Sequence, residues 1–154
     1  MGSEERLKMT IDTNILVAYL DGDKGVIDSI RSWRRAGATL ILSTVVETEL
    51  LSYSAYSPED RRDVELFLEE NFLSVSFDRT LARIAANIRS VHKIKFPDAA
   101  IAATALATQT PIVTRNIKDW RTSSSTPAPW PKPLRSAPRS TAVTRCGSSE
   151  TSSP

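Results

Sequence analysis

Two kinds of apolar segment alternate along residues 9–120. Short apolar or β-prone runs predict strands at 9–11, 39–43, 72–77 and 111–114. Longer stretches with helical spacing or composition predict helices at 15–20, 25–35, 45–53, from 58 onward, 78–93 and 97–108. The predicted strands are mostly continuous apolar runs, which is typical of a parallel sheet covered by helices on both faces. The pattern therefore predicts an α/β fold.

Residues with known end preferences mark several of these helices. Thr13 is the predicted N-cap of the first helix, and Ser57 followed by Pro58 predicts a second helix start. Gly37 predicts a helix end. Along 78–93 one side is apolar (Leu81, Ile84, Ile88, Val91) and the opposite side is basic (Arg79, Arg83, Arg89, Lys93). We interpret the basic side as a solvated helix face, with an RNA-contacting surface as the alternative.

The last 34 residues differ in kind from the rest of the chain. Residues 121–154 contain 14 Ser or Thr and six of the nine Pro, and such a segment has too little apolar surface to offset its ordering entropy. We expect it to be disordered. Its Ser, Thr, Pro and Arg are also typical of a shifted reading frame, and both explanations stay open. The sequence thus divides into a leader or upstream start (1–8), a domain (9–120) and this tail.

Charge and rare residues exclude several classes of protein. The net charge of +2 combines a net of −2 over residues 1–120 with a net of +4 over 121–154, which excludes a histone-like DNA-coating protein. A single Cys (Cys146) and a single His (His92) exclude an intramolecular disulfide and a Cys/His zinc site. With no signal-peptide pattern and no run of about 18 apolar residues, we expect a soluble, cytoplasmic protein without a membrane segment.

Three carboxylates stand in unusually apolar surroundings. Asp12, Glu49 and Asp98 each lie near the end of a predicted strand or in a predicted helix that follows one. Burial of an unpaired charge is costly, and ligands of parallel α/β sheets bind at the carboxyl ends of the strands. Asp119, after the last predicted strand, is a fourth candidate. Carboxylates without His or Cys favour Mg²⁺ or Mn²⁺, ions that activate water at phosphodiesters.

Each acid also has a structural interpretation. Asp98 in a first helical turn interacts favourably with the helix dipole, and Asp12 is suited to a turn or cap. Asp119 is suited to a local cap or salt bridge. Glu47 competes with Glu49, but residues two positions apart do not share a helix face. We favour Glu49.

Four segments carry a resemblance to PIN domains, most closely to the VapC-like ribonuclease toxins of bacterial toxin–antitoxin pairs. They occur in the order found in that family: 11–16 (IDTNIL), 43–51 (STVVETELL), 96–104 (FPDAAIAAT) and 112–120 (IVTRNIKDW). The resemblance implies a parallel sheet of four to five strands sandwiched between helices. It also implies an endoribonuclease that hydrolyses RNA phosphodiesters with water activated by Mg²⁺ or Mn²⁺.

The resemblance assigns roles residue by residue. It implies that the catalytic and metal-binding acids are Asp12, Glu49, Asp98 and Asp119. It places cofactor-binding polar groups at Asn14, Thr114 and Asn116, with Thr13 and Thr114 supplying hydroxyls near the metal. Asn14 would orient Asp12, and Asn116 would share or replace the role of Asp119. The implied partners are an RNA substrate, a cognate antitoxin protein and a second copy of the chain.

Two departures from the family leave alternatives open. Relatives begin near Met9, and they continue past the last motif into an edge strand, whereas nothing in 121–154 has the pattern of one. The first alternative is therefore a PIN-like module that has lost catalysis and binds RNA or protein. The second is a metal-dependent phosphatase, which is disfavoured because Asn14 stands where a DxD pattern has its second acid.

Overall fold

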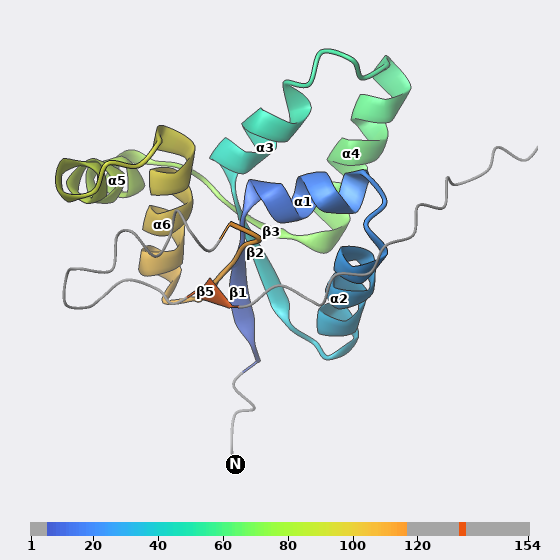
Figure 1. Ribbon diagram of the computed structural model, residues 1–154, viewed down its shortest axis with the longest axis horizontal. Helices are drawn as coiled ribbons and strands as arrows, with labels where there is room; N and C mark the ends of the chain where they lie inside the picture. The colour runs from blue at the N-terminus through green and yellow to red at the C-terminus, as the bar shows by residue number, and fades with distance from the viewer. Residues whose placement is uncertain (1–5, 117–132, 135–154) are drawn as a thin grey trace, which may run out of the picture.

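The computed structural model describes residues 6–116 and the strand Pro133–Leu134 (Figure 1). In this part of the chain, parallel strands form one sheet in the order β3-β2-β1-β4-β5. The strands are β1 (Lys8–Ile11), β2 (Thr39–Ser43), β3 (Leu73–Val75), β4 (Ile112–Val113) and β5 (Pro133–Leu134). The helices are α1 (Thr13–Leu20), α2 (Lys24–Arg35), α3 (Thr44–Leu51), α4 (Pro58–Asn71), α5 (Arg79–Val91) and α6 (Phe96–Thr108).

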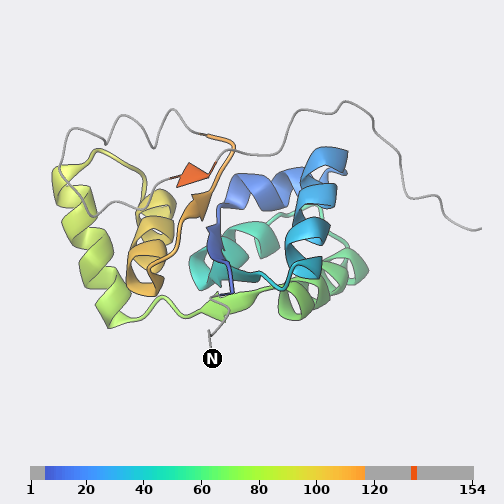
Figure 2. The same ribbon diagram turned by 90° about the horizontal axis from the view of Figure 1, so that it is seen from below.

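The sheet lies between two layers of helices. Helices α5 and α6 lie on one side of it, and α1, α2 and α4 lie on the other (Figures 1 and 2). From β1 the chain passes through α1 and α2 to β2, and it later reaches β4, on the other side of β1, through α5 and α6. The carboxyl ends of β1 and β4 are therefore a topological switch point, where α/β folds bind ligands.

The core follows from the apolar runs of the central strands. Met9, Ile11, Leu40 and Leu42 are at most 2% exposed, because these strands are central in the sheet and helices cover both of its faces. Helix α6 is buried along 99–105, and five of these seven residues are alanines. Small side chains let a helix approach a sheet closely, so this helix packs against β1, β2 and β4.

The predicted α/β class and parallel sheet are confirmed. The edge strand β3 is shorter than predicted, and Leu73 is 56% exposed because nothing pairs beyond it in the described sheet. Val91 was placed on the apolar side of its helix, but it is the last residue of α5 and is 66% exposed. That placement was wrong.

The helix ends agree with the sequence in two cases out of three. Ser57 and Asp60 form a capping box at the start of α4, and hydrogen bonds from Ser57 lower the pKa of Asp60. Gly37, with φ of 75°, follows the C-cap of α2 as predicted. The N-cap of α1 is Asp12, not Thr13. The hydroxyl of Thr13 instead donates to Glu49, so the capping prediction was wrong.

The C-terminal edge of the sheet differs from the prediction. No strand was expected in 121–154, yet Val113 of β4 lies in parallel register with Leu134 of β5. An edge strand pairs on one side only, so Pro133, which lacks an N–H, is tolerated there. The predicted leader, the disorder of the tail and its frameshift explanation concern residues largely outside those described. No helix within the described ranges has the length and apolarity needed to cross a membrane.

Candidate active site

A cavity of about 760 Å³ opens at the carboxyl edge of the sheet. We call it the acidic cavity because the predicted acids Asp12, Glu49 and Asp98 all line it. They come from the β1–α1 junction, from α3 and from α6, segments far apart in the sequence. The full lining is Asp12, Thr13, Asn14, Val17, Ala18, Asp21, Glu49, Lys95, Pro97, Asp98, Arg115 and Asn116.

Asp12 is the most deeply placed acid, with 4% of its surface exposed. It directly follows β1, so the strand fixes its backbone. Its Oδ2 accepts hydrogen bonds from the Nδ2 of Asn14 at 2.8 Å and from the Oγ1 of Thr114 at 2.6 Å. Two donors on one carboxylate oxygen hold the side chain in one orientation.

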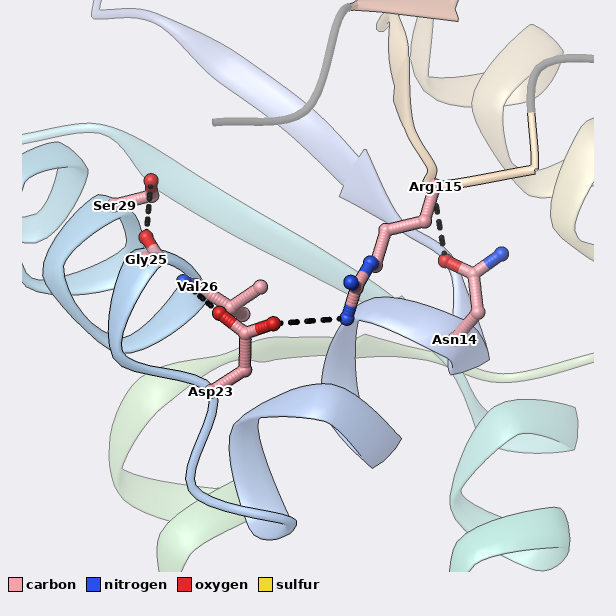
Figure 3. Close-up of polar contacts among 6 residues, drawn as sticks. All are labelled: Asn14, Asp23, Gly25, Val26, Ser29 and Arg115. Carbon is pink, nitrogen blue, oxygen red and sulfur yellow. Dashed lines mark hydrogen bonds and ion pairs between the residues drawn. The ribbon is translucent and has the colours of Figure 1, made fainter. Parts of the chain in front are cut away.

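Thr114 links Asp12 to the end of β4. Its side chain is fully buried, and its hydroxyl also accepts from the Nδ2 of Asn14 and from the backbone N–H of Asn116, each at 3.0 Å. The Oδ1 of Asn14 accepts from the backbone N–H of Arg115 at 3.0 Å (Figure 3). Hydrogen bonds thus join the start of α1 to the residues after β4.

Glu49 enters the cavity from α3. Its Oε2 accepts a hydrogen bond of 2.7 Å from the hydroxyl of Thr13. Glu47, the competing acid, instead accepts from the hydroxyl of Ser74 and does not line the acidic cavity. Partial burial, and to a smaller extent the charge of Glu69, raise the pKa of Glu47. Glu49 lines the acidic cavity together with Asp12 and Asp98, in line with the preference drawn from the sequence.

Asp98 reaches the cavity from the first turn of α6. The helix begins at Phe96 with Lys95 as N-cap and Pro97 in the first turn. Packing of α6 against α3 and β1 brings this turn to the carboxyl edge of the sheet. Asp119 lies outside the described residues, and its role stays a prediction.

Sequence reasoning missed several residues of the cavity wall. Asp21, Lys95 and Arg115 line it, and none was assigned a role. Asp23, in the α1–α2 connection, forms an ion pair of 3.1 Å with Arg115. Arg115 stands beside Thr114 in one of the family-like segments, which was an available signal. Nothing local to Asp23 predicts its pairing with a residue 92 positions away.

The donors around the cavity suit a hard divalent cation. They are carboxylates, supplemented by hydroxyl and amide oxygens, and such ligands favour Mg²⁺ or Mn²⁺. Within residues 6–116, however, no three acidic or imidazole side chains converge tightly enough to form a metal-binding cluster. The donor chemistry therefore fits a metal, while Asp12, Glu49 and Asp98 face the cavity as separate groups.

The family model of the PIN domain matches residues 9–121, which is most of the chain. The chain belongs to the PIN domain family. The matched span contains all four acids proposed from the sequence and the four family-like segments. No curated protein sequence matches the chain.

Solved structures share the fold of this PIN domain. VapBC2 from Rickettsia felis, bound to a promoter DNA fragment, matches with a TM-score of 0.69 and 20% identity, over 84% of this chain and 98% of that one. A toxin–antitoxin complex from Klebsiella pneumoniae matches with a TM-score of 0.65 and 24% identity, over 80% of this chain and 98% of that one. VapBC-1 from nontypeable Haemophilus influenzae matches with a TM-score of 0.66 and 16% identity, over 84% of this chain and 98% of that one. The PIN-like fold prediction is confirmed.

Proposed function

We propose that this PIN domain is a Mg²⁺- or Mn²⁺-dependent endoribonuclease and the toxin of a toxin–antitoxin pair. The observation that carries the proposal is the convergence of Asp12, Glu49 and Asp98 on one cavity at the switch point of the sheet. Membership of the PIN family and the likeness to toxin–antitoxin structures support it. We further propose that the protein acts in the cytoplasm and forms a homodimer.

Each residue has a part in the proposed chemistry. Asp12, Glu49, Asp98 and Asp119 would hold the cation, which when bound supplies Lewis acidity and an activated water. Asn14 and Thr114 orient Asp12 through their hydrogen bonds, and Thr13 orients Glu49. Asn116 supports the same site from the cavity wall. Lys95 and Arg115 offset the negative charge that would otherwise repel RNA.

An antitoxin would block this site by filling it. A guanidinium group of a partner protein would form bidentate hydrogen bonds with the carboxylates of the acidic cavity. A second hollow of about 420 Å³ shares Thr13, Val17, Asp21 and Glu49 with it and continues to Leu50, Tyr53 and Tyr56. A partner with an apolar side chain beside its Arg would fill both hollows, so replacing that Arg by Ala should relieve inhibition of cleavage.

Cleavage of total cellular RNA by the purified protein tests the enzymatic proposal. We expect cleavage with Mg²⁺ or Mn²⁺, loss of cleavage with EDTA, and loss in Asp98→Asn. Asp78→Asn is a matched control, because Asp78 caps α5 through a contact with Leu81 and does not line the acidic cavity. Asn retains the capping oxygen, so this variant should fold and cleave normally.

The second candidate function is an inactive PIN-like module that binds RNA or protein. The separation of the three acids in residues 6–116, which form no metal cluster, favours it. Folded wild-type protein that cleaves none of a broad RNA panel with either metal would support this alternative. Cleavage that survives in Asp98→Asn would instead point to a contaminating nuclease and contradict the assignment of the site.

A further inference from the structure

Two basic residues line the acidic cavity, Lys95 and Arg115, and contacts with other residues hold Arg115 in place. It follows β4 by two residues and lines the cavity together with the three acids. Its side chain is 43% exposed, so the guanidinium is accessible from the cavity. Its backbone N–H donates to Asn14, whose amide also donates to Asp12. The position of Arg115 is thus tied to that of the most buried acid.

Asp23 restrains the other end of the Arg115 side chain. Its Oδ2 lies 3.1 Å from the Nη1 of Arg115, and its Oδ1 accepts from the backbone N–H of Val26 at 3.1 Å (Figure 3). The second contact makes Asp23 the N-cap of α2. A carboxylate held by a helix start gives the guanidinium a fixed partner, which a mobile surface acid would not.

The ion pair leaves most of the guanidinium available. Arginine has five N–H donors in a rigid planar arrangement. In the described part of the chain, the guanidinium of Arg115 pairs with Asp23, and it does so through Nη1. Such a group suits the two oxygens of a phosphodiester. A half-exposed ion pair contributes little to stability, so a purely structural role explains this doubly anchored arrangement poorly.

We propose that Arg115 binds a backbone phosphate of the RNA next to the scissile bond, and that Asp23 is its positioning residue. This inference rests on the proposed ribonuclease function. Arg115 would supply attraction to a phosphate where the acids alone would repel it. Asp23 would keep the guanidinium at one distance from Asp12, so that a bound RNA presents its phosphodiester to the acids in one register.

RNA binding measured without cleavage tests the role of Arg115. The background is Asp98→Asn with EDTA, and the probe is a fluorescent single-stranded RNA followed by anisotropy over a range of salt concentrations. Arg115→Ala should raise Kd about tenfold. It should also make the slope of log K against log salt less negative by about 0.7, the contribution of one phosphate contact. Arg115→Lys should restore the slope and part of the affinity.

Arg35→Ala is the matched control for lost charge. Arg35 is exposed and ends α2, just before the start of β2, so it lies toward the opposite edge of the sheet. We expect its Kd to change less than about twofold, since it removes no phosphate contact. Equal effects of Arg115→Ala and Arg35→Ala would overturn the proposal for Arg115. Thermal unfolding of each variant shows that the proteins compared are folded.

Asp23→Asn tests the positioning of Arg115 while the positive charge of Arg115 is kept. Asn still caps α2, while the charged partner of Arg115 is lost. With Asp98 intact and metal present, we expect kcat/KM to fall about fivefold, with the salt slope of binding unchanged, because the cation remains but is no longer held. Unchanged or faster cleavage would overturn the positioning role. Wild-type protein that binds RNA through Arg115 but never cleaves it would overturn only the proposed function.

Discussion

Thr114 is the residue on which the polar contacts around Asp12 converge. Its hydroxyl donates to Asp12 and accepts from both Asn14 and the backbone N–H of Asn116. A single buried oxygen therefore sets the orientation of an acid, an amide and the segment after β4. Residues that orient metal ligands in this way commonly matter nearly as much as the ligands themselves.

Thr114→Val preserves the shape of the side chain and removes these contacts. We expect RNA cleavage to fall about 10- to 100-fold. We expect the free energy of unfolding to fall by about 1–3 kcal/mol, because buried polar partners lose their hydrogen bonds. Thr104→Val is the control, since Thr104 is equally buried but its hydroxyl, among the described residues, donates within α6 to the carbonyl of Ala100. Equal cleavage by the two variants would show that orientation by Thr114 is dispensable.

The sequence predicts the acids of the site, and its resemblance to PIN domains names Asn14 as the residue that orients Asp12, but it does not predict every contact that arranges these acids. Asp12 and Asp98 are conspicuous because a charge within an apolar run needs a reason, and both line the acidic cavity. Thr13 was read as a cap because capping is a local preference, whereas its hydroxyl contacts Glu49, 36 residues away. The pair of Asp23 and Arg115 depends in the same way on tertiary structure and has no local signature.

Three described helices end in left-handed backbone: α1 at Gly22, with φ of 83°, α2 at a second glycine and α6 at a larger residue. Gly37 after α2 has φ of 75°, and Gln109 at the end of α6 has φ of 54°. A side chain in this region is strained, and glycine is not. A Cβ at position 37 would meet no heavy atom within 4 Å, so backbone conformation alone decides the effect of substitution there.

Substitutions at the ends of α2 and α6 should have opposite signs. Gly37→Ala should lower the free energy of unfolding by about 1 kcal/mol. Gln109→Gly should raise it by about 0.5 kcal/mol, because relief of strain exceeds the entropy that glycine adds to the unfolded chain. Denaturant unfolding of both variants measures the two differences. Stabilisation by Gly37→Ala would contradict a left-handed conformation at that position.

Helices and strands could be predicted from the sequence where their apolar pattern extends over enough residues. The central strands β1 and β2 are apolar because both faces of the sheet are covered, and they were found almost residue for residue. The two-residue strand β5 was missed, since Pro133 and Leu134 carry no periodicity and pair through their backbone. β5 forms through backbone pairing with β4, not through a pattern in its own sequence.

At the scale of the whole molecule, β5 decides whether β4 is an interior or an edge strand. With β5 in place, β4 pairs with β1 on one side and with β5 on the other. Without it, the backbone groups of Ile112 and Val113 on that side would face water or another chain. Such an exposed edge is a template for association between copies.

Two shortened chains test this role of β5. A chain of residues 1–134 keeps β5 and should unfold at the temperature of the full-length protein. A chain of residues 1–116 should lose about 1–2 kcal/mol of stability from the missing backbone pairs, which lowers its unfolding temperature by about 3–6 °C. Calorimetry measures the temperatures, and light scattering measures association.

The charge of the shorter chain makes the association measurement informative. Residues 1–116 carry a net charge of −2, and residues 1–134 carry a net charge of 0. Mutual repulsion between copies is therefore stronger for the 1–116 chain, and charge alone would reduce its association. Greater association of the 1–116 chain would follow from the uncovered edge of β4. Equal stability and equal association of the two shortened chains would show that β5 contributes nothing to the sheet.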